Sequence, residues 1–181
     1  MAQEDAGSRF FKKRDKDIEE ALAGNDPKVL NEWAFYYFNT DQYEEAIDCF
    51  LKIVDLDPDF PAVHFNLGCA LMRVGLVPES VLEFREALRR TPDDPEIHFN
   101  LALSLNQLDD NAGAIAALEK ALALKPDYRE ALLLLGSIHA KTGSPAQAAR
   151  AFETYLRHTP DADNADVLQE YIQRLRREAG S

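Results

Sequence analysis

The sequence predicts an all-α solenoid, a fold in which short helical units stack one after another. Three observations predict it: a fixed period, helix-capping signals that recur with that period, and a small residue at one recurring place. The period is 34 residues, because the stretch Pro61–Asp94 aligns without a gap with residues 27–60, 95–128 and 129–162. A fixed period of this length is typical of units that bury their apolar faces only against their neighbours.

An Asp-Pro pair is expected to begin the first helix of the unit in the first and third copies. Asp26 and Asp94 can accept hydrogen bonds from the unpaired backbone N–H groups of a first helical turn. Pro27 and Pro95 suit that turn, because the N–H that proline lacks has no helical partner there. The pair therefore predicts where these two helices start.

A residue in the left-handed conformation is expected to end the first helix of each unit. Gly75 and Gly143 hold this place in the second and fourth copies, and Asp41 and Asp109 hold it in the first and third. The second helix follows and is expected to end near a proline that cannot continue it. These prolines are Pro58, Pro92, Pro126 and Pro160.

A small residue recurs at the twentieth place of each copy, where the two helices of a unit are expected to cross. In chain order these residues are Ala46, Ser80, Ala114 and Ala148. They are expected to face a second small residue on the first helix, which is Ala34, Gly68, Ala102 or Gly136. With little side-chain bulk on either side, the two helix axes can approach closely.

The pattern as a whole resembles the tetratricopeptide repeat, which sets bulky, small and aromatic residues and a late proline at fixed spacing. In residues 61–94 the matching positions are His64, Leu67, Gly68, Leu71, Ser80, Phe84, Ala87 and Pro92. The resemblance covers four copies, residues 27–162, and implies a right-handed superhelix whose concave groove is lined by the first helices. Because many unrelated systems use this repeat as an interaction surface, it implies binding without naming the partner.

Two segments flank the repeats. Residues 1–26 are expected to hold a polar tail and a helix from about Arg9 to Ala23. Two roles are open for that helix, capping the first repeat or folding back into the groove. Residues 163–181 are expected to hold a capping helix with a polar outer face. Its expected apolar stripe is Val167, Leu168, Tyr171, Ile172 and Leu175.

The chain is acidic, with 32 Asp and Glu against 20 Lys and Arg and a net charge of −12. This argues against a nucleic acid or an anionic membrane as the main partner, because both need a basic surface. No apolar run reaches the ~18 residues of a membrane-spanning helix, and the first residues lack the apolar core of a signal peptide. Two cysteines without close spacing indicate a reducing compartment, so we expect a cytoplasmic protein.

No pattern typical of an enzyme or a metal site stands out in the sequence. We find no nucleophile–base pair, phosphate-binding loop or paired-carboxylate motif. His64 and His98 lie one repeat apart without a third ligand, so we interpret them as partly buried residues of the repeat. Cys49 and Cys69 are interpreted as core or groove residues rather than as a disulfide. We therefore expect no cofactor, no metal and no catalytic activity.

The resemblance assigns particular side chains to the concave groove, where a peptide or helix of a partner protein would bind. They are Asn31, Phe35, Phe38, Phe65, Asn66, Cys69, Met72, Phe99, Asn100, Leu103 and Asn106. Asn66 and Asn100 hold the same place in two successive His-Phe-Asn-Leu tetrads. Because an amide both donates and accepts, such a pair can hold an extended main chain whatever its side chains. The alternative is that both asparagines are simply consensus residues of the repeat.

Apolar residues occupy two faces of the first helices. Phe35 and Phe65 belong to the groove face, whereas Trp33 and Leu67 belong to the core face. A helix that is apolar on both sides is usually buried on both sides. Three covers for the groove are open: the N-terminal helix, a second copy of the chain in a homodimer, or an apolar segment of a partner.

One well-known use of the family is not expected here. Members that bind an acidic chaperone C-terminus hold its carboxylate with Lys, Asn and Arg side chains, and the matching positions here are Asn31, Phe35, Asn66, Glu96 and Asn100. Only Asn66 agrees, and the charge of Glu96 would repel a carboxylate.

The expected function is therefore that of a protein–protein interaction adaptor. Three alternatives stay open at the level of sequence. The chain could be a secretion or assembly chaperone for an apolar client segment. The first repeat's segment WAFYYFNTDQYEEA loosely resembles the sequences of such chaperones. It could be a regulatory or oligomerising subunit of an enzyme complex, such as a glycosyltransferase-type scaffold. It could also be a structural protein that assembles through its own N-terminal helix.

Overall fold

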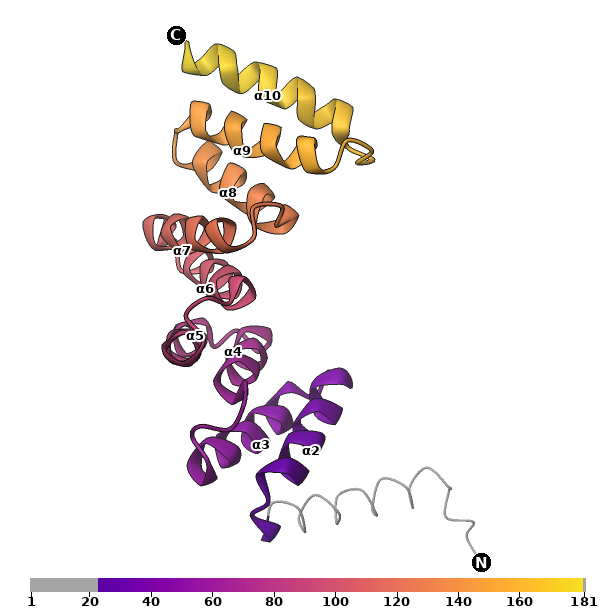
Figure 1. The fold of residues 1–181 in the computed structure, drawn as a ribbon, viewed down its shortest axis with the longest axis vertical. Coiled ribbons are helices and arrows are strands. Elements are labelled where there is room, and N and C mark those ends of the chain that lie inside the picture. Colours follow the sequence, from indigo (N-terminus) through magenta and orange to yellow (C-terminus); the bar gives the residue numbers. More distant parts are fainter. Residues whose placement is uncertain (1–22, 181) are drawn as a thin grey trace, which may run out of the picture. The chain divides into compact units, whose positions relative to one another are not determined.

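The computed structural model describes residues 23–180, which form α-helices joined by short turns, without a β-strand in this range (Figure 1). The helices are α2 (Pro27–Asn39), α3 (Tyr43–Leu56), α4 (Val63–Arg73), α5 (Val77–Arg90), α6 (Pro95–Gln107), α7 (Asn111–Leu124), α8 (Arg129–Lys141), α9 (Pro145–His158) and α10 (Ala165–Ala179). The predicted all-α class is confirmed. The helix expected from about Arg9 to Ala23 lies almost entirely outside the described residues.

The chain divides into two compact units, Met1–Glu83 and Phe84–Ser181, and the boundary falls within α5. In the first unit α3 packs against both α2 and α4, and in the second unit α6 to α10 each pack against the next helix along the chain. Burial against sequence neighbours is what a solenoid requires. The repeat boundaries inferred from the sequence remain a prediction, because this division follows contacts rather than repeats.

The predicted helix starts of the first and third repeats are confirmed. The Oδ1 atom of Asp26 accepts a hydrogen bond from the backbone N–H of Lys28 at 2.9 Å. Asp94 does the same for Glu96 at 2.8 Å and for Ile97 at 3.4 Å. Each carboxylate satisfies N–H groups that the helix itself cannot pair.

The predicted left-handed residues at the ends of the first helices are also confirmed. Gly75 and Gly143 have φ angles of 82° and 71°, and Asp41 and Asp109 have φ angles of 59° and 58°. Aspartate tolerates this region better than most residues, because its short polar side chain can bond locally. Glycine and aspartate therefore close equivalent turns in alternate repeats.

The two turn aspartates have a second role that the sequence did not reveal. A carboxylate oxygen of Asp41 lies 3.5 Å from Arg73, and one of Asp109 lies 2.6 Å from Lys141. In both cases the base lies at the end of the first helix of the following repeat. The guanidinium of Arg73 also lies 4.4 Å from the ring centroid of Tyr43. Because these pairs are exposed, they fix geometry more than they add stability.

The core of each unit is built where the helices of a repeat cross. Ala46 in the first unit and Ser80, at the start of α5, are fully buried, as are Ala114 and Ala148 in the second. Large side chains fill the space around them; in the first unit these include Leu30, Phe50, Ile53 and Leu67, and in the second Leu132, Phe152 and Tyr155.

The glycine of the fourth repeat faces a different neighbour from the one predicted. A Cβ atom added to Gly136 would lie 2.5 Å from Cε1 of Phe152, so the ring of Phe152 is its nearest side-chain neighbour rather than Ala148. Phe152 is itself buried between α8 and α10. The glycine therefore makes room for an aromatic ring of the facing helix.

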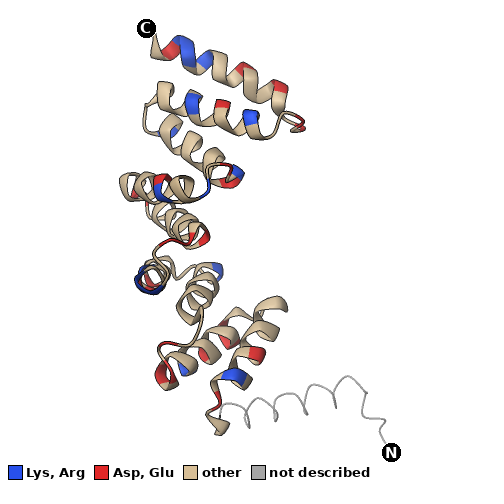
Figure 2. Cartoon of the chain, in the orientation of Figure 1, with Lys and Arg blue, Asp and Glu red and all other residues tan. Residues whose placement is uncertain are grey.

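The C-terminal helix α10 closes the second unit. Leu168, Ile172 and Leu175 are buried against α9, and Arg176 pairs with Glu153 of α9 at 2.8 Å. Figure 2 marks Lys and Arg positions in blue along this helix. The expectation that Val167 joins the apolar stripe is wrong, since this residue is 71 % exposed. Val167 precedes Leu168 and so lies about 100° around the helix from the buried face.

Replacing Gly136 with Ala is expected to lower the free energy of unfolding by about 1–3 kcal/mol, because the added methyl group overlaps the buried ring of Phe152. Thermal unfolding followed by circular dichroism measures the effect. Gly180→Ala is the matched control, since a Cβ there would meet its nearest atom at 3.7 Å. An unaltered melting temperature for Gly136→Ala contradicts the close packing described here.

His139 is expected to make stability depend on pH. Burial lowers the pKa of this imidazole, against a smaller opposite effect of Glu119, and within residues 23–180 its buried Nδ1 atom has no hydrogen-bond partner. The unfolded chain therefore takes up a proton more readily than the folded chain. The stabilising effect is complete above the ordinary histidine pKa and is lost as pH falls through the lower folded value.

The comparison uses His139→Leu, because Leu71 and Leu105 hold the same place in other repeats. Melting temperatures at about pH 7.5 and about pH 5 should differ less in this variant than in the original chain. The same loss of stability on acidification in both proteins rules out His139 as its source.

Candidate functional site

Helices α2 and α4 carry the predicted groove residues of the first unit. Phe35 on α2 is 41 % exposed, and the other members are half-buried. These others are Asn31, Phe38, Phe65, Asn66, Cys69 and Met72. None of the seven belongs to the fully buried core. The first unit therefore brings two helices with incompletely buried apolar and amide side chains into one compact body.

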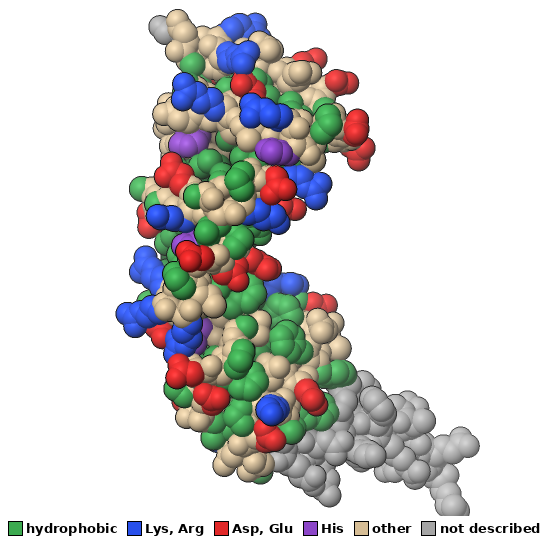
Figure 3. Space-filling model, viewed as in Figure 1, with side chains coloured by type: hydrophobic (Ala, Val, Ile, Leu, Met, Phe, Trp, Pro, Cys, Tyr) green, Lys and Arg blue, Asp and Glu red, His purple; other side chains and the backbone are tan. Residues whose placement is uncertain are grey.

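The aromatic rings of this face are held in place by neighbouring rings. Phe35 meets Phe50 edge-on, with ring centroids 6.1 Å apart and an angle of 90° between the planes. Phe38 meets Tyr43 in the same manner at 5.4 Å. Such contacts fix the orientation of a ring. Hydrophobic side chains are visible on the surface over this part of the chain (Figure 3).

Helix α6 carries the predicted groove residues of the second unit, Phe99, Asn100, Leu103 and Asn106, all half-buried. The ring of Phe99 lies 4.9 Å from that of Tyr128. Burial, together with the charges of Glu96, Glu130 and Asp94, raises the pKa of Tyr128 to about 12. The phenol therefore stays neutral at physiological pH, and Nζ of Lys125 lies 4.6 Å from its ring centroid.

The two asparagines of the proposed main-chain ladder lie in different units, so their spacing stays a prediction. Asn100 donates from Nδ2 to the backbone oxygen of Glu96, at 2.9 Å, within its own helix. This bond uses one donor and orients the amide. The remaining acceptor and donor capacity of Asn100 is what a bound main chain would use.

Carboxylates rather than bases characterise this face. Glu32 holds the place of Asn66 and Asn100 in the first repeat, and it is exposed. Glu96 and Glu130, near the start of α6 and α8, are exposed as well. Two bases at the ends of first helices, Arg73 and Lys141, bond to turn aspartates. The Asp41–Arg73 pair recurs two repeats later as Asp109–Lys141, and this recurrence in the sequence could have revealed both pairs.

The second unit also has an open polar depression beside the start of α8. It is lined by Glu96, Lys125, Asp127, Tyr128, Arg129, Glu130 and His158. Tyr128, which precedes α8, makes no side-chain capping bond to the helix. Because charges of both signs line it and His158 is exposed, the depression is a solvated surface rather than an apolar binding pocket.

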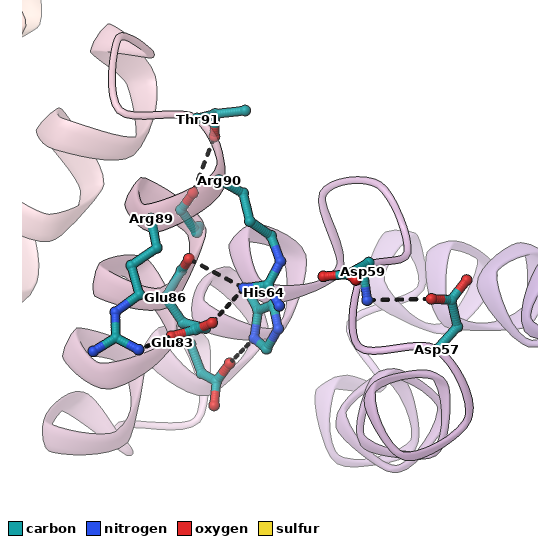
Figure 4. Close-up of polar contacts among 9 residues, drawn as sticks. Asp57, Asp59, His64, Glu83, Glu86, Arg89, Arg90 and Thr91 are labelled. Atoms are coloured by element: carbon teal, nitrogen blue, oxygen red, sulfur yellow. Dashed lines mark hydrogen bonds and ion pairs between the residues drawn. The ribbon is translucent and has the colours of Figure 1, made fainter.

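His64 and His98 each have one local polar contact through a ring nitrogen. His64 is buried, and its Nδ1 atom lies 2.7 Å from Oε2 of Glu83, as Figure 4 shows. The Nε2 atom of His98 lies 2.8 Å from the backbone oxygen of Pro92. Cys49 and Cys69 are not joined in a disulfide; Cys49 is buried, and burial raises its pKa to about 11, whereas Cys69 is half-buried.

Within residues 23–180 no group of three or more His, Cys, Asp and Glu side chains is arranged to hold a metal ion. In the same range no helix combines the length and the apolar character that crossing a membrane requires.

Models of the tetratricopeptide repeat match residues 65–129 and 107–173, and a further TPR repeat model matches residues 36–75. The chain belongs to the tetratricopeptide repeat (TPR) family. No curated protein sequence matches it. The predicted family is thus confirmed over most of the described residues, and the helix pairs described above are TPR helix pairs.

Several solved TPR structures resemble this one. MamA from Desulfovibrio magneticus RS-1 is 21 % identical, with 86 % of this chain and 94 % of that chain covered, at a TM-score of 0.74. YrrB, described as a TPR protein with an unusual peptide-binding site, is 24 % identical, with 91 % and 85 % covered, at 0.70. A TPR protein from Parabacteroides merdae ATCC 43184 is 19 % identical, with 83 % and 60 % covered, at 0.76. At these identities the likeness establishes the α-solenoid fold alone.

Proposed function

We propose that this TPR protein is a non-catalytic adaptor that binds a peptide or a helix of a partner protein along its first helices. The observation that carries the proposal is the incompletely buried apolar side chains of α2 and α4, where Phe35 is 41 % exposed and Phe38, Phe65 and Met72 are half-buried. Helices α2 and α4 already bury their other face in the core. A second apolar face has no structural role unless a ligand covers it.

The rings supply affinity in this proposal. Fully desolvating an aromatic side chain is favourable by about 25 cal/mol for each Å² of apolar surface removed from water. Phe35 and Phe38 are oriented by Phe50 and Tyr43, so little side-chain entropy is lost when a partner covers them. Met72 adapts to partners of different shape, because its thioether chain is flexible.

In this proposal the amide side chains fix the position of the bound peptide main chain along the groove. Asn66 and Asn100 lie on α4 and α6 and are both half-buried. A half-buried amide is protected from competing water yet open to a ligand, so its bonds to a peptide main chain are retained. YrrB, a TPR protein with a peptide-binding site, supports a peptide as the class of ligand.

The charges select the partner. Glu32, Glu96 and Glu130 are exposed, whereas Arg73 and Lys141 bond to turn aspartates. An acidic peptide or a C-terminal carboxylate would therefore be repelled, and a neutral or basic apolar segment would be accepted. On the composition given above, we place this adaptor in the cytoplasm.

A chaperone for an apolar client segment is the second candidate, and the same apolar face favours it. A chaperone should keep one client soluble when the two are co-expressed, whereas an adaptor should form a stable complex with a protein that is soluble by itself. The solubility of the captured partner in the absence of this protein decides between them.

The groove is tested by affinity capture from the source lysate with three full-length baits. Phe65→Glu/Phe99→Glu is expected to lose the partner that the original chain captures, because two charges enter the apolar face. Leu82→Glu, at a 63 % exposed position on α5, is the matched control and should retain it.

Circular dichroism must show that all three baits are folded. A partner retained by the double variant, or lost equally by Leu82→Glu, places the binding surface elsewhere and contradicts the proposal.

A further inference from the structure

We propose that the apolar face of α2 and α4 is occupied, in the absence of a partner, by the segment Arg9–Lys16 of the same chain. This inference rests on the proposed function, because it takes that face to be a binding surface. It adds a regulatory consequence: a partner has to displace the segment in order to bind.

Charge is the first reason. Residues 23–83 contain 11 Asp and Glu but only three Lys and Arg, and one of these bases, Arg73, is paired with Asp41. Figure 2 marks Asp and Glu positions in red along α2 and α3. Glu32 lies on the groove face of α2 itself and is exposed. The first unit therefore attracts a basic ligand more strongly than the mean charge of the chain implies.

Apolar exposure is the second reason. Val29 and Phe35 on α2 are both among the exposed large hydrophobic residues of residues 23–180. On the same helix, the Oδ1 atom of Asn31 is buried, and within the described residues no donor bonds to it. The exposed apolar side chains fit a ligand that itself carries apolar rings.

The segment has the matching composition. Residues 9–16 read RFFKKRDK, which gives two adjacent phenylalanines, five bases and one acid. No stretch of residues 23–83 combines bases and aromatic rings in this way. Arg and Lys side chains also offer several donors each, and Arg can stack on an aromatic ring.

The chain is long enough to bring the segment to its site. Ten residues, 17–26, separate it from the start of α2. They span at most about 35 Å when extended. Phe35 lies eight residues into α2, which is about 12 Å along the helix axis. The connection is therefore long enough to reach the site, and a short tether gives an effective concentration of about 1 mM.

Cys69 reports whether the site is covered. It lies on α4 between Phe65 and Met72 and is half-buried, whereas Cys49, the other cysteine of the chain, is buried and has a pKa raised to about 11. A disulfide reagent such as dithionitrobenzoate therefore reacts at Cys69 well before Cys49. The rate of this reaction in the full chain measures the access of solvent to the groove.

The test compares the original chain with Phe10→Ser/Phe11→Ser, which removes both rings of the segment. Reaction at Cys69 is expected to be about tenfold faster in this variant, since a tenfold change corresponds to ~1.4 kcal/mol of lost contact. Asp15→Ser is the matched control, because it alters the segment but keeps its rings and bases, and its rate should not exceed that of the original chain. Melting temperatures verify that the variants remain folded.

A second experiment exchanges the charges of Glu32 and of the segment. Glu32→Lys should accelerate the reaction at Cys69, and adding Lys12→Glu/Lys13→Glu to it should restore the original rate, because the two charges are then exchanged. Acceleration without restoration contradicts a direct contact between Glu32 and the segment.

The dependence of the reaction rate on protein concentration distinguishes the intrachain segment from a second copy of the chain. An intrachain contact gives the same rates over a hundredfold range of concentration. Protection that grows with concentration assigns the site to a second copy of the chain and overturns the proposal. Equal reaction rates in all variants show that the groove is uncovered and also overturn the proposal. The proposed function is decided separately, by whether Phe65→Glu/Phe99→Glu loses the partner.

Discussion

The structure depends on the close crossing of the two helices within each repeat. A TPR unit has no core of its own beyond this crossing and the contact with its neighbours, so the side chains at the crossing must be small. Ala46, Ser80, Ala114 and Ala148 are all fully buried there. At Gly136 even a methyl group would overlap Phe152. The helix caps and the turn aspartates then orient helices that these small side chains allow to approach closely.

The same constraint generates the candidate site. Because both helices of a repeat are needed for the core, the first helix has only its outer side available for a ligand. In the first unit that side remains apolar, with Phe35 exposed and Phe65 and Met72 half-buried. The bases near it, Arg73 and its counterpart Lys141 in the second unit, bond to the turns of the preceding repeats. The proposed recognition surface is therefore one of rings, amides and carboxylates.

Much of the fold could be predicted from the sequence, because its signals are local and repeat every 34 residues. Asp26 and Asp94 cap their helices and Gly75 and Gly143 turn left-handed as expected, since each depends on a few adjacent residues. The pairing of Asp41 with Arg73 was missed, because it joins residues 32 apart whose side-chain directions depend on packing. The aromatic contact of Phe99 with Tyr128 and the exposure of Val167 depend on packing in the same way. For the site, the sequence predicted the candidate residues but not which bases are engaged elsewhere.

The central claim is that a partner covers the first helices, and side-chain footprinting of the complex tests it most directly. Hydroxyl radicals oxidise exposed rings and thioethers, so the free protein and the complex with its captured partner can be compared residue by residue. The account predicts lower oxidation of Phe35, Phe65 and Met72 in the complex, with Leu82 on α5 unchanged. Lower oxidation at Leu82, with Phe35 and Met72 as reactive as in the free protein, would contradict it.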